Sequence, residues 1–93
     1  MPEPHFRIVI REPEFEEQLA ALLVNAEEAD DFTLGAEFVL ARNPQSGMPA
    51  NADGSVWYLP MCLVRGRQVS LFYTFDEQTV TFLFIVALDE AGG

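Results

Sequence analysis

The chain has 93 residues, 49% of them apolar, which is the composition of one folded domain rather than of a disordered tail. Fifteen acidic residues against five basic ones give a formal net charge of −10, which repels phosphate backbones and argues against general nucleic-acid binding. The apolar runs are too short to span a membrane, and the start of the chain carries acids where a secretory signal carries bases, so we expect a cytoplasmic protein without membrane contact. An acid-rich composition without lysine is also typical of salt-rich habitats, and both explanations of the charge stay open.

The chain opens with a predicted strand followed by a helix. Residues 6–10 alternate so that Phe6, Ile8 and Ile10 share one face of the strand. A helix begins at Pro13, because proline suits the first helical position and the surrounding acids favour the positive end of the helix dipole. Its apolar residues recur at helical spacing and form one stripe that packs on a sheet: Phe15, Leu19, Leu22, Leu23 and Ala26.

A second helix is predicted from Phe32 to Arg42. The apolar pattern pauses over residues 25–31 and then resumes, and Leu34 and Phe38 are among the residues that widen the apolar face. We interpret the pause as a tight connection between two helices, although one long bent helix fits the same pattern. Arg42 suits the negative end of a helix dipole.

The two predicted helices carry most of the negative charge. Nine of the fifteen acids fall between Glu12 and Glu37, and we interpret them as a solvated face. The acids of residues 27–31 lack the ligand spacing of a calcium loop, so we expect no metal site there. The sequence shows no phosphate-cradling loop either, and we expect no cofactor.

Three antiparallel strands are predicted in the second half of the chain. Residues 43–54 hold two prolines and two glycines and are expected to form a mobile surface loop. Residues 55–64 form a strand in which Pro60 lacks a ladder donor, so the strand lies at an edge or has a bulge there. Residues 68–75 and 79–88 form a β-hairpin across a short polar turn. The sequence therefore predicts an α+β fold: a strand, two helices and a three-stranded antiparallel meander that form one sheet with the helices packed on one face.

The predicted hairpin is apolar on both faces toward its end. In its second strand, strict alternation places on one face Val80, Phe82, Phe84 and Val86. Leu83 and Ile85 then lie on the opposite face. Strands that are apolar on both faces need cover on both. The helices supply one cover, and we expect a partner to supply the other.

This order of elements resembles the RelE/ParE superfamily, the toxin subunits of bacterial and archaeal type II toxin–antitoxin pairs. The likeness rests on three features. In residues 6–23 a strand runs directly into an amphipathic helix, and Asn43-Pro44 with Gly47 forms an Asn-Pro…Gly signal. Residues 56–57 are followed by residues 69–76, a strand that carries a Tyr before an acidic turn. The resemblance implies a single RelE/ParE-like domain over residues 1–93, with a cognate antitoxin protein as its partner.

The resemblance fails at the catalytic positions. In the ribonuclease branch, basic residues and a Tyr or His cut messenger RNA in the ribosome. Here Ser70 or Leu71 stands where the family has an arginine before Tyr73, and Asp89-Glu90 stands where the family has a later basic cluster. We therefore expect reduced or atypical toxicity, and lean against an enzyme; an active form would be an RNA endonuclease.

Four residues remain as candidates for catalysis or phosphate contact: Arg42, Arg65, Arg67 and Tyr73. The three arginines could form the only basic spot of an acidic protein, and Arg65 and Arg67 would then be its one route to nucleic acid. Gly66-Arg67 also resembles the Gly-Arg of the gyrase-inhibiting ParE branch. The competing interpretation is that the arginines pair with local acids and that Tyr73 belongs to the core.

A protein interface is predicted around Trp57, Tyr58 and Met61. Trp57 and Tyr58 alternate faces, so one packs inward and the other, beside Met61, could anchor a partner. We interpret Cys62 as a buried structural thiol and His5 as a surface residue.

Two functional hypotheses follow. The first is a toxin-like subunit of a type II pair, whose second sheet face is covered by an antitoxin. The second is a non-enzymatic homodimeric binding module that keeps the fold and pairs through an edge strand or the Trp57 face. An unrelated small enzyme is disfavoured, because the sequence shows no recognisable set of nucleophile, base and orienting group.

Overall fold

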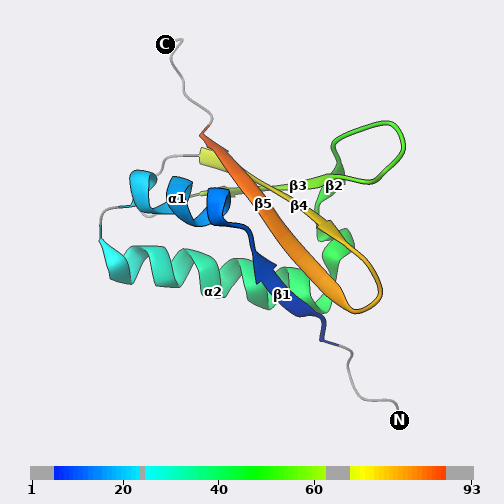
Figure 1. Cartoon of the computed structure of the whole chain (residues 1–93), viewed down its shortest axis with the longest axis horizontal. Helices are drawn as coiled ribbons and strands as arrows, with labels where there is room; N and C mark the ends of the chain where they lie inside the picture. Colours follow the sequence, from blue (N-terminus) through cyan, green and yellow to red (C-terminus); the bar gives the residue numbers. More distant parts are fainter. Residues whose placement is uncertain (1–5, 24, 63–67, 88–93) are drawn as a thin grey trace.

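The computed structural model describes residues 6–23, 25–62 and 68–87, which form a mixed sheet with two helices on one of its faces (Figure 1). The elements in chain order are β1 (Ile8–Arg11), α1 (Pro13–Leu22), α2 (Ala26–Arg42), the 3-10 helix η1 (Pro44–Ser46), β2 (Met48–Pro49), β3 (Trp57–Cys62), β4 (Gln68–Phe75) and β5 (Thr79–Ala87). The predicted α+β class, with helices on one face of one sheet, is confirmed.

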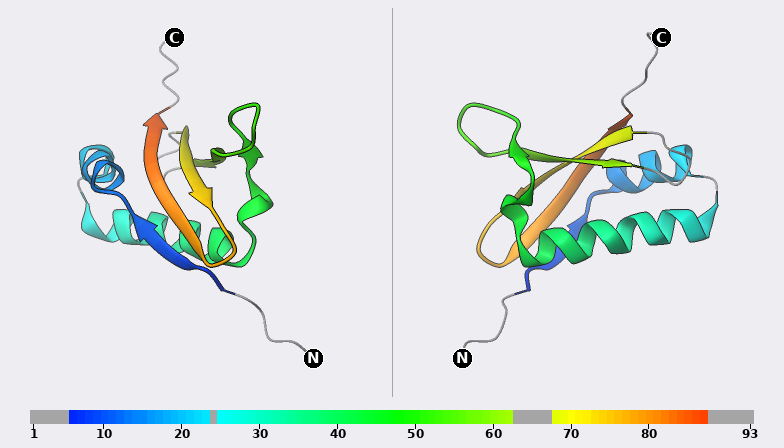
Figure 2. Two further views of the ribbon diagram at one scale, coloured as in Figure 1. Left: turned by 45° about the vertical axis from the view of Figure 1, so that its right-hand side comes forward. Right: turned by 180° about the vertical axis from the view of Figure 1, so that it is seen from behind.

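The strand order in the sheet is β1-β5-β4-β3-β2. The predicted antiparallel meander of β3, β4 and β5 is present, and β1 joins it beside β5 in parallel, with Ile8 opposite Thr79. Figure 2 shows β1 and β5 running side by side, with α2 behind the strands in the left view and in front of them in the right view. Two details of the order were not predicted: the place of β1 at the β5 edge, and the two-residue strand β2 that pairs with β3.

The two helices are separate, and the second begins earlier than the apolar pattern indicates. Asn25 caps α2, because its side-chain oxygen accepts hydrogen bonds from the backbone N–H groups of Glu27 at 2.8 Å and Glu28 at 3.3 Å. The predicted start at Phe32 was therefore wrong. Residues 26–31 are a solvated first turn and a half of helix, which is held by the cap and by helix-dipole interactions of the acids rather than by burial.

The core lies between the helices and the sheet. Phe15 of α1 packs edge to face on Phe82 of β5, with 5.2 Å between ring centroids, and both side chains are fully buried. Two apolar residues of α2 do not join this core. Leu34 and Phe38 are each 63% exposed, so their predicted place on the buried face of the helix was wrong. The buried stripe of α2 consists of Phe32, Thr33, Ala36 and Leu40.

A β-bulge in β5 breaks the strict alternation that was predicted for this strand. Phe72 of β4 lies opposite Phe84, whereas the next residue, Tyr73, lies opposite Phe82. Leu83 is therefore the extra residue, and the inward positions shift from even to odd numbers after it. Ile85, with 4% exposure, thus joins Phe82 in the core. Phe84 lies on the other face, which corrects the predicted sharing of one face by Val80, Phe82, Phe84 and Val86.

The segment between α2 and β3 is more ordered than predicted. It holds η1 and β2, and the buried hydroxyl of Tyr73 ties it to the sheet by donating to the Pro44 carbonyl and accepting from the Gly47 N–H at 3.2 Å. A Cβ atom on Gly47 would lie 2.3 Å from the Tyr58 carbonyl oxygen and 2.5 Å from the Tyr73 hydroxyl. Only glycine fits at position 47, because the backbone here passes directly over β3 and leaves no room for a Cβ atom.

Candidate protein-binding face

The face of the sheet that lies opposite the helices carries no charged side chain at the outward positions of its described long strands. Inward positions alternate with these and pack against the core, and Arg7 and Arg11 lie on the inward, helix-covered side with Val9. We call this surface the uncharged sheet face, and its residues are Ile8 and Ile10 of β1, Thr79, Thr81, Phe84 and Val86 of β5, Ser70, Phe72 and Thr74 of β4, and Tyr58 and Pro60 of β3.

A row of three aromatic rings crosses the middle of this face. Phe72, on the central strand β4, stacks on Phe84 of β5 with 4.7 Å between centroids and 16° between ring planes. On its other side, Phe72 stacks on Tyr58 of β3 at 5.7 Å. The register of the two strand pairs places these residues directly opposite one another, so cross-strand packing stabilises the row.

Large aliphatic side chains surround the aromatic row and are exposed. Ile8 is 67% exposed, Ile10 44% and Val86 42%. Exposed aliphatic side chains gathered with aromatic rings on one uncharged face favour a site for another protein or for a ligand. No helix or loop among the described residues covers it.

The three residues predicted as an interface are divided between the two sides of the sheet. Tyr58 lies on the uncharged sheet face. Trp57 and Met61 lie on the other side and pack against the core, and the Trp57 indole N–H donates to the Gly54 carbonyl at 2.9 Å. Trp57 also packs edge to face on Phe75, at 5.5 Å between centroids. Sequence alternation indicated this division, but not which ring faces outward.

Tyr73 is a structural residue. Its side chain is fully buried, and its hydroxyl is bonded to both Pro44 and Gly47. Burial raises the pKa of the Tyr73 hydroxyl above its ordinary value, and the hydrogen bond from Gly47 offsets part of this rise. A group in this position does not meet a substrate.

The predicted basic spot is only partly within the described residues. Arg42, at the end of α2, lies between two exposed rings, 4.7 Å from the centroid of Phe38 and 5.3 Å from that of Phe6. These cation–π contacts hold its guanidinium at the helix end. Arg65 and Arg67 lie outside the described residues, as do His5 and the side chain of Cys62.

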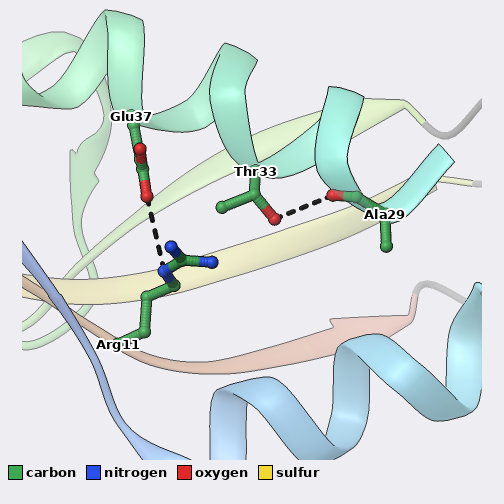
Figure 3. A network of polar contacts seen from close by, with 4 residues as sticks. All are labelled: Arg11, Ala29, Thr33 and Glu37. Carbon is green, nitrogen blue, oxygen red and sulfur yellow. Dashed lines mark hydrogen bonds and ion pairs between the residues drawn. The ribbon is translucent and has the colours of Figure 1, made fainter. Parts of the chain in front are cut away.

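A groove runs between α1 and α2, and three of its polar side chains are engaged with neighbours. Figure 3 shows Arg11 reaching across it from β1, with its Nε atom 3.4 Å from Glu37 Oε2. The Thr33 hydroxyl donates to the Ala29 carbonyl at 2.8 Å. The part that Leu19 lines has a volume of about 310 Å³. The one hydroxyl among the residues that line the groove, that of Thr33, is bonded to a backbone carbonyl rather than to a carboxylate.

Comparison of the chain with protein-family models, with curated proteins and with solved structures gave no match. Within the described ranges, no three His, Cys, Asp or Glu side chains are grouped as metal ligands. The helices of the described part also lack the combined length and apolar character needed to cross a bilayer.

Proposed function

We propose that this chain is the toxin-like subunit of a type II toxin–antitoxin pair, with reduced or atypical toxic activity, and that it acts by binding protein. The observation that carries this proposal is the uncharged sheet face. A chain with a net charge of −10 leaves aliphatic side chains exposed on the face that carries the aromatic row, with Ile8 at 67% exposure. Such a surface fits a protein partner and does not fit a phosphate backbone.

The arrangement of the helices supports the toxin-like assignment. The resemblance to the RelE/ParE superfamily needs a strand, two helices and an antiparallel meander in this order, and the described elements follow it. Both helices pack on one side, which leaves the opposite sheet face for the antitoxin that the resemblance implies.

The described arginines do not support RNA cleavage. Arg7 donates from Nε to the Asp76 carbonyl at 2.6 Å, Arg11 pairs with Glu37, and Arg42 lies between aromatic rings. Each is engaged with its own neighbours, so they do not converge on a position where a scissile phosphate could bind. Neither ribosome-dependent cleavage nor gyrase inhibition is supported by these residues.

Tightly repressed expression in a bacterial host tests the proposal. Growth is followed after induction, and the 5′ ends of cellular transcripts are mapped in the same cultures. We expect slowed growth without new cleavage ends, and the same result for Tyr73→Phe, which keeps the ring and removes the hydroxyl. New ends that disappear in Tyr73→Phe would overturn the proposal and make this tyrosine a catalyst.

A second candidate function is a non-enzymatic homodimeric binding module that keeps the fold. It is favoured by the absence of charge on the uncharged sheet face, which lets two acidic copies meet without like charges in contact. The packing of Trp57 against the core argues against the Trp57 face as its contact. Induction without any effect on growth would favour this module over the toxin-like subunit.

A further inference from the structure

We infer that the occupant of the uncharged sheet face in the purified protein is a second copy of this chain, packed sheet against sheet, and that added salt strengthens this dimer. The inference rests on the proposed function of this face in binding protein, and it names the partner and the electrostatic signature of the contact.

The distribution of charge favours a second copy over a basic partner. Nine of the fifteen acids lie between Glu12 and Glu37, and the elements of this segment cover the other side of the sheet (Figure 2). A basic partner would gain by contacting those acids, whereas the outward strand positions within residues 8–11, 57–62, 68–75 and 79–87 offer it no carboxylate. Two copies that meet through uncharged residues keep their acidic helices on the outside of the assembly, away from the contact.

The aromatic row suits a two-fold contact. In a symmetric dimer the same patch meets itself, so residues near the axis contact their own equivalents. Phe72 is on the central strand of the sheet and stacks on Tyr58 and Phe84, which places three rings at the centre of the patch. Central aromatic residues surrounded by aliphatic ones are the usual arrangement of binding hot spots.

The size of the face sets the expected strength. Five strands about 4.8 Å apart, with about six residues each at about 3.4 Å, give a flat footprint of roughly 500 Å² per copy. Standard interfaces bury about 800 Å² per partner, so this contact is smaller than the standard size and we expect a weak dimer that dissociates in the micromolar range.

Salt dependence follows from the net charge. Two copies of charge −10 repel each other across the helical layers, and this repulsion is long-range. The Debye length falls from about 14 Å at ~50 mM salt to about 4 Å at ~500 mM, so added salt removes most of the repulsion. We expect the dissociation constant to fall roughly fivefold over this range.

Sedimentation equilibrium of the purified full chain at the two salt concentrations tests the inference. We expect a species of twice the 10.4 kDa chain mass that dissociates less at high salt. Val86→Glu places like charges at the contact and is expected to weaken the dimer by more than about tenfold. Leu34→Glu adds the same charge at an exposed position of α2 and is the matched control, with a change of less than about twofold expected because the site is not at the contact.

Phe72→Thr is a second test of the contact, used in case Val86→Glu does not fold. Threonine favours strands, so β4 is expected to form in this variant. Circular dichroism confirms that each variant is folded before its association is compared. We expect Phe72→Thr to weaken the dimer as Val86→Glu does.

Three results would overturn the inference: a monomer at both salt concentrations, a dimer that weakens with salt, or equal effects of Val86→Glu and Leu34→Glu. The last would indicate a different contact, such as the open edge of β1. The growth experiment is a separate readout. If the chain is monomeric but Val86→Glu relieves an effect on growth that Leu34→Glu retains, the dimer is rejected and the proposed function stands with another partner.

Discussion

The two faces of the sheet have similar aromatic content but differ in cover. On the helix side, Phe82 is fully buried and meets Phe15 edge to face. On the uncharged sheet face, Phe84 stacks on its strand neighbour Phe72, and Ile8 and Val86 of the same face are exposed. The same strand supplies Phe82 and Phe84. The difference teaches that apolar composition alone does not decide burial in this chain; the number of helices available to cover the sheet decides it.

The largest expected effect compares the two phenylalanines of β5. Phe82→Ala should lower the free energy of unfolding by about 3–5 kcal/mol, because it opens a cavity against Phe15. Phe84→Ala should cost less than about 2 kcal/mol, since its ring packs on one side only. Urea unfolding at a concentration low enough to keep the chain monomeric measures both. Equal losses would mean that the two faces are covered alike in the isolated chain.

A second comparison uses two glycines on the helix side. Gly47→Ala should destabilise the chain by about 2 kcal/mol, because its Cβ would collide with the Tyr58 carbonyl and with the hydroxyl of Tyr73. Gly35→Ala is the control: it lies within α2 with no atom near its Cβ position, and should stabilise the chain by about 0.5–1 kcal/mol. Thermal unfolding distinguishes opposite signs readily. If Gly47→Ala left the stability unchanged, the segment that Tyr73 holds would be able to move away from β3 at little cost.

The smallest expected effect concerns the turn at the end of β4, beside the uncharged sheet face. The Asp76 carboxylate accepts hydrogen bonds from the N–H groups of Gln78 and Thr79, both at 2.7 Å, and these lower the pKa of Asp76. A carboxyl whose pKa is lower in the folded state stabilises the fold above its unfolded pKa of about 3.9 and loses this contribution as pH falls through the folded value.

Asp76→Asn should therefore lower the melting temperature slightly at neutral pH, and the difference from the parent chain should shrink as the pH falls below the ordinary pKa of a carboxyl group and vanish once the folded carboxyl is protonated. Glu17→Gln removes the same charge from an exposed helical position and serves as the control. A difference between Asp76→Asn and the parent that persists unchanged in acid would show that the charge of Asp76 is not what stabilises the turn.

Most of the fold was predictable because its signals are local. The hairpin of β4 and β5 follows from two β-rich runs around a polar turn, and Pro60 correctly indicated a strand with a free edge, since β2 pairs only with Trp57 and Tyr58. The start of α2 was missed because its first residues are solvated and show no apolar period. Asn25 was the available signal, since asparagine is a strong N-cap residue.

The candidate face was predicted in outline but not in membership. An excess of apolar residues on both sides of the hairpin indicated an uncovered surface, and the helices do pack on one side only. The bulge at Leu83 could not be read from alternation, because a bulge shifts the period without changing the composition. One result of this shift is a hydrogen bond between the sheet and α1, in which the Ile85 N–H donates to the side chain of Gln18 at 2.7 Å.

The parallel pairing of β1 with β5 has a consequence for how the chain is made. Residues 8–11 leave the ribosome before their partners at residues 79–82, because both helices and the strands β2 to β4 lie between them in the chain. During this interval the nascent strand β1 has no neighbour in the sheet, and Ile8 and Ile10 remain in water. Closing such a long loop is slow, because the contact is distant in sequence. The period of synthesis is therefore when this chain is most exposed to chaperones and to aggregation.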